Sequence, residues 1–424
     1  MSTSADLPPE VRRIVVVGAG ECGTHAAMAL RDKGFDGEIT LIGRESVHAY
    51  ERPPLSKGAL AVDEMALVHP WTPEQLEQAR IDLRLGVEVT GIDLEAGTVS
   101  TTTSRTTGGG EPAEVPWDRL LLALGSDPRH LELDEVTYLR THEDAEALRA
   151  LLRPQGHLLV VGAGFIGLEI AAGARERGMD VTVVEAGPRA LGRIVPEEVA
   201  AQVVALHEAH GVPLRVATTV TGLRREGDQV RAVLSDGDEL VVDAVVAGIG
   251  AAPTTALAEA AGLVVDDGIV VDAALRTSDP RVFAAGDCAS FPDARSGGRV
   301  RLESWRNAHD QAETAAASML GQGEAHVAVP WFWSDQYDQM LSVAGLPGTG
   351  ERSVLRHRDD GVLLHLGLDA QDRLVHAAAV GPGASVAKDI RVAERLIAAA
   401  VPLDPAQLED PGVPLRSILK AATA

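Results

Sequence analysis

The sequence predicts an α/β fold with two similar parallel-sheet domains and a smaller α+β domain at the C-terminus. Three observations lead to this prediction: a duplicated strand–loop–helix–strand unit, strands that are apolar along their whole length, and a change of pattern after Pro330. Strands without a polar face are typical of parallel sheets that helices cover on both sides. With 424 residues the chain is long enough for several such domains.

The first unit begins close to the N-terminus. The apolar run 14–17 predicts a buried strand that enters the glycine-rich loop 18–23, and an alanine-rich helix and a second strand over 38–42 follow. In such a loop the first glycine permits a tight turn, the second lets the backbone approach a pyrophosphate, and the third allows close packing of the helix. Free N–H groups at the helix N-terminus favour phosphate. We therefore expect a dinucleotide at this loop.

The same pattern returns 144 positions later in the chain. A strand over 157–161 enters the loop 162–167, which has the same glycine spacing, and a helix and a strand that ends at Glu185 follow. A carboxylate at this point can accept a hydrogen bond from a ribose 2′-OH and would repel a 2′-phosphate. The second site is therefore expected to prefer NADH to NADPH. In the first unit Gly43 stands at the equivalent position, and Glu45 is the candidate for the ribose contact.

Short strands with turn chemistry connect and follow these units. Residues 98–114 are expected to form a hairpin or an exposed loop around three glycines at 108–110, and 229–242 to form a hairpin. The tail after about residue 327 combines strand-like stretches with one long helix, which is typical of an α+β domain. Further strands are expected over 268–274, 281–285, 341–344, 362–366 and 374–380, and helices over 307–320 and 386–400.

The composition argues against several classes of protein. Lys and Arg number 38 and Asp and Glu number 62, which gives a net charge of −24. Such an acidic chain is expected to bind neither nucleic acid nor anionic membranes. No apolar run reaches the ~18 residues of a membrane-spanning helix. Residues 1–10 lack the apolar segment of a secretory signal, so a cytoplasmic protein is expected.

The two cysteines, Cys22 and Cys288, are interpreted as packing residues at close backbone contacts. Two thiols so far apart in sequence argue against a disulfide framework, a CxxC redox pair and a cysteine-rich metal site, so no metal site is expected. His207 and His210 do not have the HExxH spacing, and a solvated helix face is expected for both. The sequence Arg356-His357-Arg358 is interpreted as a short basic cluster in a loop.

Three longer motifs are more specific than the glycine loops. They are Tyr50-Glu51-Arg52-Pro53-Pro54-Leu55-Ser56-Lys57, Gly286-Asp287-Cys288-Ala289 and Trp331-Phe332-Trp333-Ser334-Asp335-Gln336. Together they resemble motifs of the NADH-dependent ferredoxin reductases of the putidaredoxin reductase and biphenyl dioxygenase reductase type. The similarity extends from Ile14 to about Ile418, which is essentially the whole chain.

The resemblance implies two Rossmann-like dinucleotide-binding domains, one for FAD and one for NAD, and a C-terminal α+β domain. It implies an enzyme that carries electrons from NADH through FAD to a [2Fe–2S] ferredoxin, which serves a cytochrome P450 or a Rieske oxygenase. The absence of a CxxC motif argues against the disulfide reductases of the same architecture. The expected domain bounds are 1–125 and 252–326 for FAD, 126–251 for NAD and 327–424 for the C-terminal domain.

The resemblance also implies roles for matching residues. Phe165 is expected over the flavin face where nicotinamide enters, and Lys57 and Glu169 are expected as an ion pair beside the flavin. From the residues alone, an exposed lysine and a helix-start acid favoured by the helix dipole are the alternatives. Arg44 departs from the family, which commonly has Asp or Glu there. The residues expected to bind FAD are Gly18, Gly20, Cys22, Gly23, Glu45, Arg52, Lys57, Val89, Arg129, Asp287 and Trp305, and those expected to bind NAD are Gly162, Gly164, Ile166, Gly167, Glu185, Arg193 and Gly250.

Aromatic residues gather at the start of the C-terminal domain. Alternation along a strand predicts Phe332 in the core, and it places Trp331 and Trp333 on one side, as candidates for a contact patch. We expect the ferredoxin to dock near these two tryptophans. The basic residues expected to offset the acidic charge there are Arg295, Arg299, Arg301 and Arg306.

Two other functions remain open from the sequence. One is a flavin- and NADH-binding interaction protein that resembles apoptosis-inducing factor, and the other is an NADH oxidase on the same scaffold. Rapid NADH-dependent reduction of an added [2Fe–2S] protein distinguishes the reductase from both.

Overall fold

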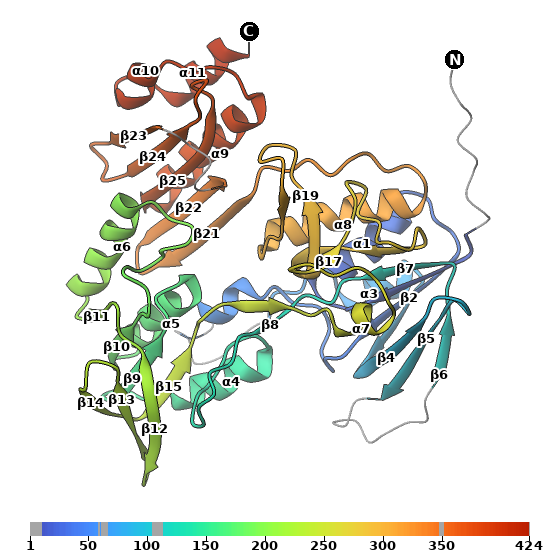
Figure 1. The fold of residues 1–424 in the computed structure, drawn as a ribbon, viewed down its shortest axis with the longest axis horizontal. Helices are drawn as coiled ribbons and strands as arrows, with labels where there is room; N and C mark the ends of the chain where they lie inside the picture. The colour runs from blue at the N-terminus through green and yellow to red at the C-terminus, as the bar shows by residue number, and fades with distance from the viewer. Residues whose placement is uncertain (1–10, 58–59, 61–66, 104–112, 347–351, 424) are drawn as a thin grey trace. The chain divides into compact units, whose positions relative to one another are not determined.

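The computed structural model describes residues 11–57, 60, 67–103, 113–346 and 352–423 (Figure 1). The chain divides into two compact units, and each unit is assembled from three separate stretches of sequence. The first unit comprises Met1–Glu51, Leu67–Asp127 and Ala252–Ala328, and the second comprises Arg52–Ala66, Pro128–Ala251 and Val329–Ala424. The two glycine-rich loops therefore belong to different units.

The first unit is built around a five-stranded parallel sheet. Its strands, in order across the sheet, are β18 (Val282–Ala284), β7 (Arg119–Leu122), β1 (Arg13–Val17), β2 (Glu38–Gly43) and β3 (Ile81–Leu85). The interior strand β1 is apolar on both faces, and Ile14, Val15 and Val16 are all buried. Helices α1 (Glu21–Asp32) and α8 (Trp305–Met319) pack against each other. The strand, loop and helix predicted for the first glycine-rich unit are therefore present.

Smaller strands and short helices complete the first unit. Strands β4 (Val87–Asp93), β5 (Thr98–Thr103) and β6 (Ala113–Pro116) pair in order, and β5 and β6 are antiparallel, as the predicted hairpin requires. Residues 104–112, with the three glycines, lie outside the described residues. The strand expected over 268–274 is only β17 (Ile269–Val270), because the Asp272 carboxylate accepts hydrogen bonds from the backbone of Ala274 and Arg276 and the chain turns there. The other elements are α3 (Pro73–Gln78), α7 (Ala256–Ala260), η3 (Gly286–Cys288), β19 (Ala289–Pro292) and β20 (Arg299–Val300).

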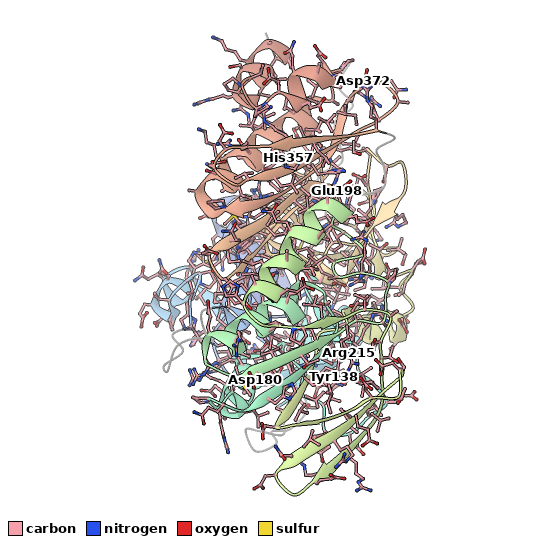
Figure 2. All side chains as sticks on the ribbon, turned by 90° about the vertical axis from the view of Figure 1, so that its left-hand side faces the viewer. Tyr138, Asp180, Glu198, Arg215, His357 and Asp372 are labelled. Carbon is pink, nitrogen blue, oxygen red and sulfur yellow. The ribbon has the colours of Figure 1, made fainter. Side chains whose placement is uncertain are left out.

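The second unit holds a four-stranded parallel sheet. Its strands, in order, are β11 (Leu214–Arg215), β10 (Asp180–Val184), β9 (His157–Val161) and β15 (Ala244–Ala247), and its helices are α4 (His142–Leu151), α5 (Phe165–Glu176) and α6 (Glu197–Ala209). The predicted hairpin over 229–242 is present. It consists of β13 (Gln229–Leu234) and β14 (Glu239–Val242), which pair with β12 (Val220–Glu226) in a separate sheet. Arg215, at the end of β11, is labelled in Figure 2. It forms ion pairs with Asp236 at 3.2 Å and with Asp238, which connect the hairpin turn to β11.

A five-stranded antiparallel sheet completes the second unit. In order it contains β21 (Trp331–Gln336), β22 (Gln339–Gly345), β25 (Leu374–Pro382), β24 (Leu363–Leu368) and β23 (Arg352–His357). Helices α9 (Gly383–Ala399), α10 (Pro405–Glu409) and α11 (Leu415–Ala422) follow it, which agrees with the predicted α+β character. Val160 and Ile170 belong to the same buried apolar cluster as Leu341 and Val380. One core therefore joins this sheet to the nucleotide-binding sheet of the second unit.

The prediction that Arg356-His357-Arg358 lies in a loop is wrong. Arg356 and His357 end strand β23, and Arg356 is only 3% exposed. Its guanidinium donates to the carbonyl of Leu408 at 3.0 Å and to that of Val413 at 2.6 Å. These carbonyls lie at and beyond the end of α10, where no further helical turn supplies donors. The basic side chain therefore has a structural role that the local sequence does not reveal.

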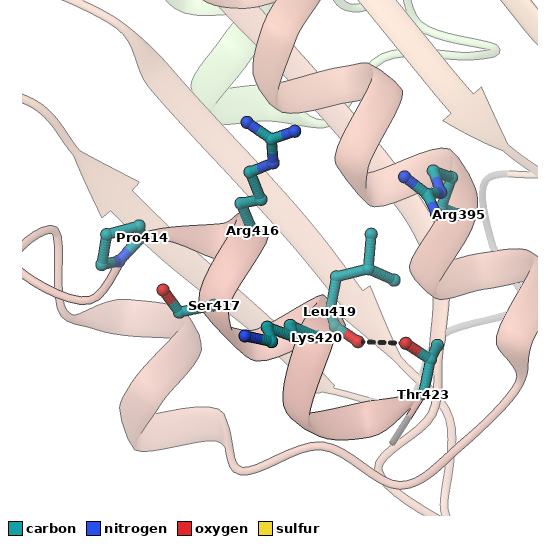
Figure 3. A pocket seen from close by; sticks show the side chains of 7 residues that line it. All are labelled: Arg395, Pro414, Arg416, Ser417, Leu419, Lys420 and Thr423. Atoms are coloured by element: carbon teal, nitrogen blue, oxygen red, sulfur yellow. Dashed lines mark hydrogen bonds between the residues drawn. The ribbon is translucent and has the colours of Figure 1, made fainter.

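A pocket of about 450 Å³ lies in the C-terminal part of the second unit (Figure 3). Three of its lining side chains are basic: Arg395 on α9, and Arg416 and Lys420 on α11. No residue predicted to bind a cofactor lines it. None of the helices in the described ranges is long and apolar enough to cross a membrane. Within these same ranges, no group of three or more His, Cys, Asp or Glu side chains is arranged to hold a metal ion.

Candidate functional site

The first glycine-rich loop is closed against its own sheet. Gly18 has a φ of +110°, and a Cβ there would lie 2.1 Å from the carbonyl oxygen of Ala123. A Cβ on Gly23 would lie 1.8 Å from the carbonyl oxygen of Gly18, so both positions require glycine for packing. A Cβ on Gly20 would meet nothing within 4 Å. The second glycine therefore faces open space, which is what the approach of a pyrophosphate to the backbone requires.

The motif Gly286-Asp287 lies next to this loop in the first unit. A Cβ on Gly286 would come within 3.3 Å of the Cβ of Cys22, and the Asp287 carboxylate accepts a hydrogen bond from Ser126 Oγ at 2.9 Å. The first loop, the segment around Ser126 and the motif Gly286-Asp287 therefore meet at one place. Of the other residues expected to bind FAD in this unit, Val89 is buried in the core and Trp305 begins α8.

Both cysteines are buried and unpaired with each other. Burial raises the pKa of the Cys22 thiol well above its usual value, and it raises the pKa of Cys288 to about 11. Thiols with raised pKa values stay protonated and react poorly with disulfides and oxidants. These observations agree with the interpretation of both cysteines as packing residues.

The second glycine-rich loop repeats this geometry in the second unit. Gly162 has a φ of +101°, a Cβ on Gly167 would lie 2.0 Å from the carbonyl oxygen of Gly162, and a Cβ on Gly164 would have its nearest neighbour at 3.8 Å. Glu185 follows β10, and its carboxylate accepts hydrogen bonds from the backbone N–H groups of Ala163 at 2.8 Å and of Gly187 at 2.7 Å. The predicted ribose acceptor thus stands at the loop itself.

The backbone confirms which residue of the first unit is equivalent to Glu185. The N–H of Gly162 donates to the carbonyl of Val184, and the N–H of Gly18 donates in the same way to that of Ile42, both at 2.8 Å. The residue after Ile42 is Gly43, so no side-chain acceptor stands at the position equivalent to Glu185. Two positions later, the Glu45 carboxylate accepts a hydrogen bond from the hydroxyl of Tyr50 at 2.5 Å.

Gly250 lies next to both Arg129, which is expected to bind FAD, and Arg193, which is expected to bind NAD. The N–H of Arg129 donates to the carbonyl of Gly250 at 2.9 Å, and a Cβ on Gly250 would lie 3.3 Å from Nη2 of Arg193. Ile166, in the second loop, is 43% exposed. Arg52, also in this unit, donates from its guanidinium to the carbonyl of Arg140.

Lys57 and Glu169 form an ion pair in the second unit, as the resemblance implies. Lys57 follows η1 (Pro53–Ser56), and its Nζ lies 3.2 Å from Glu169 Oε1 and 3.5 Å from Asp335 Oδ2. It also lies 4.9 Å from the ring centroid of Trp333, within the range of a cation–π contact. The lysine is therefore held by two carboxylates and one aromatic ring.

Glu169 is almost completely buried, with 4% of its surface exposed. Ser56 Oγ and Ser334 Oγ both donate to its carboxylate, the latter at 2.5 Å. Burial raises the pKa of Glu169, and Lys57 and the two serine hydroxyls oppose that rise because they stabilise the charged form. Ser56, Ser334 and Asp335 belong to the longer sequence motifs, but nothing in those motifs distinguishes them as site residues, because serines and acids in short motifs are usually solvated.

The two faces of β21 are used differently. Phe332 packs edge-to-face on Phe165, with ring centroids 5.1 Å apart, and contacts the buried core of the second unit. Trp331 and Trp333 stack on each other on the opposite face, also with centroids 5.1 Å apart, and both are half-buried. The alternation predicted from the sequence is therefore correct as to which residues share a face. Phe332 is half-buried like the two tryptophans, and Trp331 also packs against the buried core of the C-terminal sheet.

The four arginines predicted to offset the acidic charge form ion pairs or hydrogen bonds within the first unit. Arg301 pairs with Glu303 at 2.5 Å and Arg306 with Asp310 at 3.1 Å. Arg295 lies 3.7 Å from Asp293, and Arg299 donates to the carbonyl of Val271 at 2.7 Å. Because three of the four have acidic partners, this cluster supplies little net positive charge, and that part of the docking prediction is not supported.

The expectation that His207 and His210 form a solvated helix face is wrong for His207. His207 is 0% exposed, and its Nε2 lies 2.7 Å from Oε1 of Gln336. His210 is exposed at the end of α6, and its ring stacks on Tyr337 with centroids 3.7 Å apart. The sequence pattern of α6 does not distinguish the two, because a buried histidine needs a partner from a distant strand.

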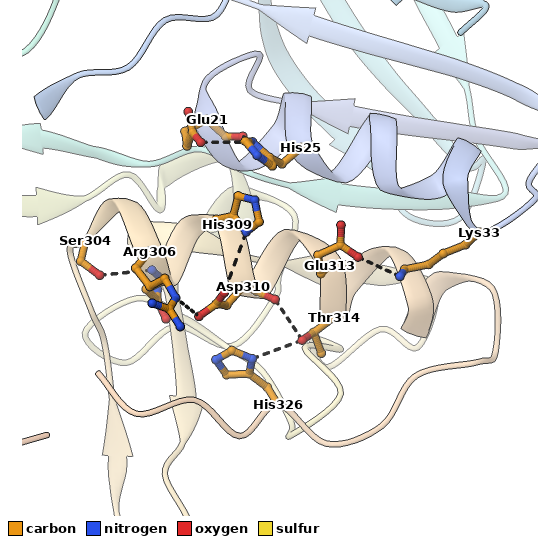
Figure 4. A network of polar contacts seen from close by, with 11 residues as sticks. Glu21, His25, Lys33, Ser304, Arg306, His309, Asp310, Glu313, Thr314 and His326 are labelled. Carbon is orange, nitrogen blue, oxygen red and sulfur yellow. Dashed lines mark hydrogen bonds and ion pairs between the residues drawn. The ribbon is translucent and has the colours of Figure 1, made fainter. Parts of the chain in front are cut away.

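An acid within the first loop was also missed. Glu21 is the first residue of α1, directly after Gly20, and its side chain lies beside that of His25 (Figure 4). The Glu21 side chain is 13% exposed. Burial, with a smaller contribution from Glu51, raises its pKa to about 7. His25, one turn later, lies 3.1 Å from the Glu21 carboxylate, and burial lowers the pKa of His25 to about 4. The sequence does contain a signal for Glu21: an acidic residue is unusual within a loop that is expected to bind phosphate.

Comparison with known proteins agrees with this geometry. The model of the pyridine nucleotide-disulphide oxidoreductase family matches residues 12–312, and a reductase C-terminal model matches residues 331–419. The chain belongs to the pyridine nucleotide-disulphide oxidoreductase family. This oxidoreductase is an enzyme that uses FAD and NADH, and the open second glycine of each loop fits the two dinucleotides.

Its relatives are similar over their whole length. The ferredoxin–NAD(+) reductase component of the anthranilate 1,2-dioxygenase system of Burkholderia cepacia is 41% identical, over 96% of this chain and 98% of the relative. Rhodocoxin reductase of Rhodococcus erythropolis is 39% identical, over 94% of this chain and 92% of the relative. Among solved structures, the covalent complex of putidaredoxin reductase and putidaredoxin has a TM-score of 0.89 at 36% identity, over 97% of this chain and 99% of that one.

Proposed function

We propose that this oxidoreductase is an NADH–ferredoxin reductase that passes electrons to a [2Fe–2S] ferredoxin of an oxygenase system. The observation that carries the proposal is the combination of two dinucleotide loops with no thiol relay. Cys22 and Cys288 are buried, their thiol pKa values are raised, and no CxxC motif is present. Without an internal disulfide, electrons from NADH must leave to an external acceptor.

The residues of the chain have separate tasks in this proposal. Bound flavin supplies the conversion of one two-electron donation into two one-electron transfers. The loops hold the pyrophosphates of the two cofactors, and Glu185 selects NADH through its ribose. Lys57 supplies a positive charge whose position is fixed by Glu169 and Asp335. Phe165, held by Phe332, covers the place where nicotinamide enters.

We assign residues 1–125 and 252–326 to FAD, 126–251 to NADH and 327–424 to the C-terminal domain. We further propose that the enzyme works in the cytoplasm, because its two thiols are unpaired, as expected in a reducing compartment. Cell fractionation with an antibody to the chain tests the location, and recovery in a membrane or extracytoplasmic fraction contradicts it.

The function is tested with the purified holoenzyme and a [2Fe–2S] ferredoxin. NADH should reduce the flavin, and the reduced enzyme should then reduce the ferredoxin much faster than it reduces oxygen. Ferricyanide serves as an acceptor that needs no specific docking. A holoenzyme that oxidises NADH rapidly with oxygen and does not reduce any ferredoxin contradicts the proposal and favours an NADH oxidase.

Trp331 and Trp333 are the proposed contact for the ferredoxin, since two half-buried, stacked tryptophans offer a large apolar surface. Trp331→Ala should slow ferredoxin reduction while NADH-to-ferricyanide activity stays near native, whereas Trp333→Ala, which also removes a contact of Lys57, should slow both reactions. Arg416→Ala and Lys420→Ala, at the basic pocket, are the matched surface controls. If the controls slow ferredoxin reduction and the tryptophan variants do not, the docking face is the basic pocket instead.

A further inference from the structure

A series of buried hydrogen bonds connects Glu169 to His207 inside the second unit. Ser334 Oγ donates to Glu169 Oε1 at 2.5 Å, Gln336 Nε2 donates to Ser334 Oγ at 3.1 Å, and Gln336 Oε1 lies 2.7 Å from His207 Nε2. The four residues are between 0% and 4% exposed. They come from three elements, α5, β21 and α6. We call this series the Glu169–His207 chain.

Alternation along β21 explains why the chain exists. Phe332, Ser334 and Gln336 share one face of the strand, and each contacts a different residue of the nucleotide-binding part: Phe332 contacts Phe165, Ser334 contacts Glu169 and Gln336 contacts His207. This face of β21 therefore supplies one of the donors that reach Glu169.

Each hydrogen bond of the chain has a fixed direction. An amide nitrogen only donates, so when Gln336 Nε2 donates to Ser334, the Gln336 oxygen faces His207 and His207 must donate from Nε2. Because Ser334 Oγ already accepts from the amide, its own proton points to Glu169. Nδ1 of His207 is buried without a hydrogen-bond partner among the described residues, as expected for a neutral ring protonated at Nε2.

We propose that His207, Gln336 and Ser334 are positioning residues that hold Glu169 as the ionised partner of Lys57 when NADH reduces the flavin. The inference rests on the proposed function, because it gives Glu169 a place beside the flavin. Its physical basis is that a buried carboxylate stays charged only while enough donors face it. Ser56 and Lys57 supply the other two, and the Glu169–His207 chain supplies the third.

The charged and titratable groups around the chain are few. Lys57 and, beyond it, Asp335 face the Glu169 end. At the His207 end lie the rings of Tyr337 and His210. Arg175 and Glu176, on α5, influence Tyr337. Burial lowers the pKa of His207 and raises that of Tyr337 to about 12, so both are neutral near pH 7.

Gln336→Glu tests the direction of the chain with almost no change of volume. The new carboxylate has two acceptor oxygens, so Ser334 must donate to it, and Glu169 loses a donor. We expect the acidic limb of the pH profile for flavin reduction by NADH to move upward by about one pH unit, because the pKa of Glu169 rises. Ser334→Ala removes only the last donor and should move the limb in the same direction.

Two variants of His207 and one control variant distinguish a role in positioning Glu169 from a purely structural role. His207→Phe should also shift the limb, whereas His207→Gln, whose amide can donate to Gln336, should restore the native profile. Gln202→Glu, also on α6, introduces the same charge outside the chain and should leave the profile unchanged. If Gln336→Glu and Ser334→Ala both keep the native profile while Glu169→Gln changes it, the chain does not position Glu169 and the proposal is overturned.

A second measurement does not depend on activity. In ¹⁵N NMR of histidine-labelled holoenzyme, the signal that His207→Phe removes should show a neutral ring protonated at Nε2 from pH 6 to pH 8. Gln336→Glu should convert it to an imidazolium. A native His207 protonated at Nδ1 overturns the proposal. If instead NADH does not reduce the native flavin, the proposed function fails, and the NMR result still reports on the chain by itself.

Discussion

Replacing Glu169 by Gln would remove a buried negative charge with almost no change in side-chain volume. The side chains of Glu169 and Lys57 are 3% and 15% exposed, so the lysine cannot turn into water without moving its neighbours. Removing one partner of a buried ion pair costs about 3–5 kcal/mol. Lys57 keeps a second carboxylate, Asp335, at 3.5 Å, so we expect the lower end, about 3 kcal/mol, for Glu169→Gln.

Two further variants test whether the cost of Glu169→Gln comes from the buried charge of Glu169. Glu169→Ala should cost more than Glu169→Gln, because the hydroxyls of Ser56 and Ser334 lose their acceptor and an unsatisfied buried group costs about 1–3 kcal/mol. Asp335→Asn is the matched control: it removes the same charge from the same lysine, but Asp335 is 43% exposed. Its effect should stay below about 1 kcal/mol.

Stability and chemistry are measured separately. A chain with two units and bound cofactors does not unfold in one step. The comparison therefore uses the urea transition reported by tryptophan fluorescence in proteins whose first-unit tryptophans, Trp71, Trp117 and Trp305, are replaced by Phe, so that only Trp331 and Trp333 of the second unit report. Stopped-flow mixing with NADH gives the rate of flavin reduction, which should fall at least tenfold in Glu169→Gln, or about 1.4 kcal/mol. The reasoning is refuted if Glu169→Gln matches the native protein in both measurements, or if Asp335→Asn costs as much as Glu169→Gln.

Three other predictions follow from the loops. Gly20→Ala should fold like the native protein but bind FAD more weakly, as measured by titration of the apoprotein with FAD. Gly23→Ala should fail to fold, because its Cβ would overlap the carbonyl of Gly18. Equal FAD affinity of Gly20→Ala and native protein contradicts the assignment of this loop to FAD. The kcat/KM of the native enzyme for NADH should exceed that for NADPH by at least tenfold, about 1.4 kcal/mol. Glu185→Ala should reduce this ratio. Equal kcat/KM values of the native enzyme for the two coenzymes exclude Glu185 as the residue that selects NADH. Burial raises the pKa of Glu21 to about 7, above the ordinary value of 4.5, so Glu21 in the folded apoprotein costs stability as pH rises from 4.5 to 7. Glu21→Gln should therefore be about 3 kcal/mol more stable than native protein at pH 8 and equal to it near pH 4.5, measured by urea unfolding of the apoproteins, and a difference that does not change with pH argues against a raised pKa.

Much of the nucleotide-binding architecture follows from short stretches of sequence. The spacing of Gly18, Gly20 and Gly23 is informative because the turn, the open position and the close helix contact are all local to six residues. The same holds for the loop that begins at Gly162. Glu185 could be placed because a strand of known length ends at a fixed edge of a parallel sheet. The alternation of β21 likewise follows from the period of a strand.

The tertiary structure decided which polar groups meet across the chain. His207 and Arg356 are both buried, although their local sequences resemble solvated surface, because their partners, Gln336 and the carbonyl of Leu408, come from distant segments. The arginines before α8 were expected to present charge to a partner, and the fold pairs most of them internally.

The Lys57–Glu169 pair is intermediate between features that the local sequence predicts and features that only the tertiary structure determines. The resemblance pointed to it, but neither residue's own sequence context distinguishes a buried pair from two solvated charges. Periodicity reports how much of a segment is buried and on which face. The choice of partner for a buried donor or acceptor depends on packing between segments, here Ser334 of β21 against α5, and no pattern within one segment contains that information.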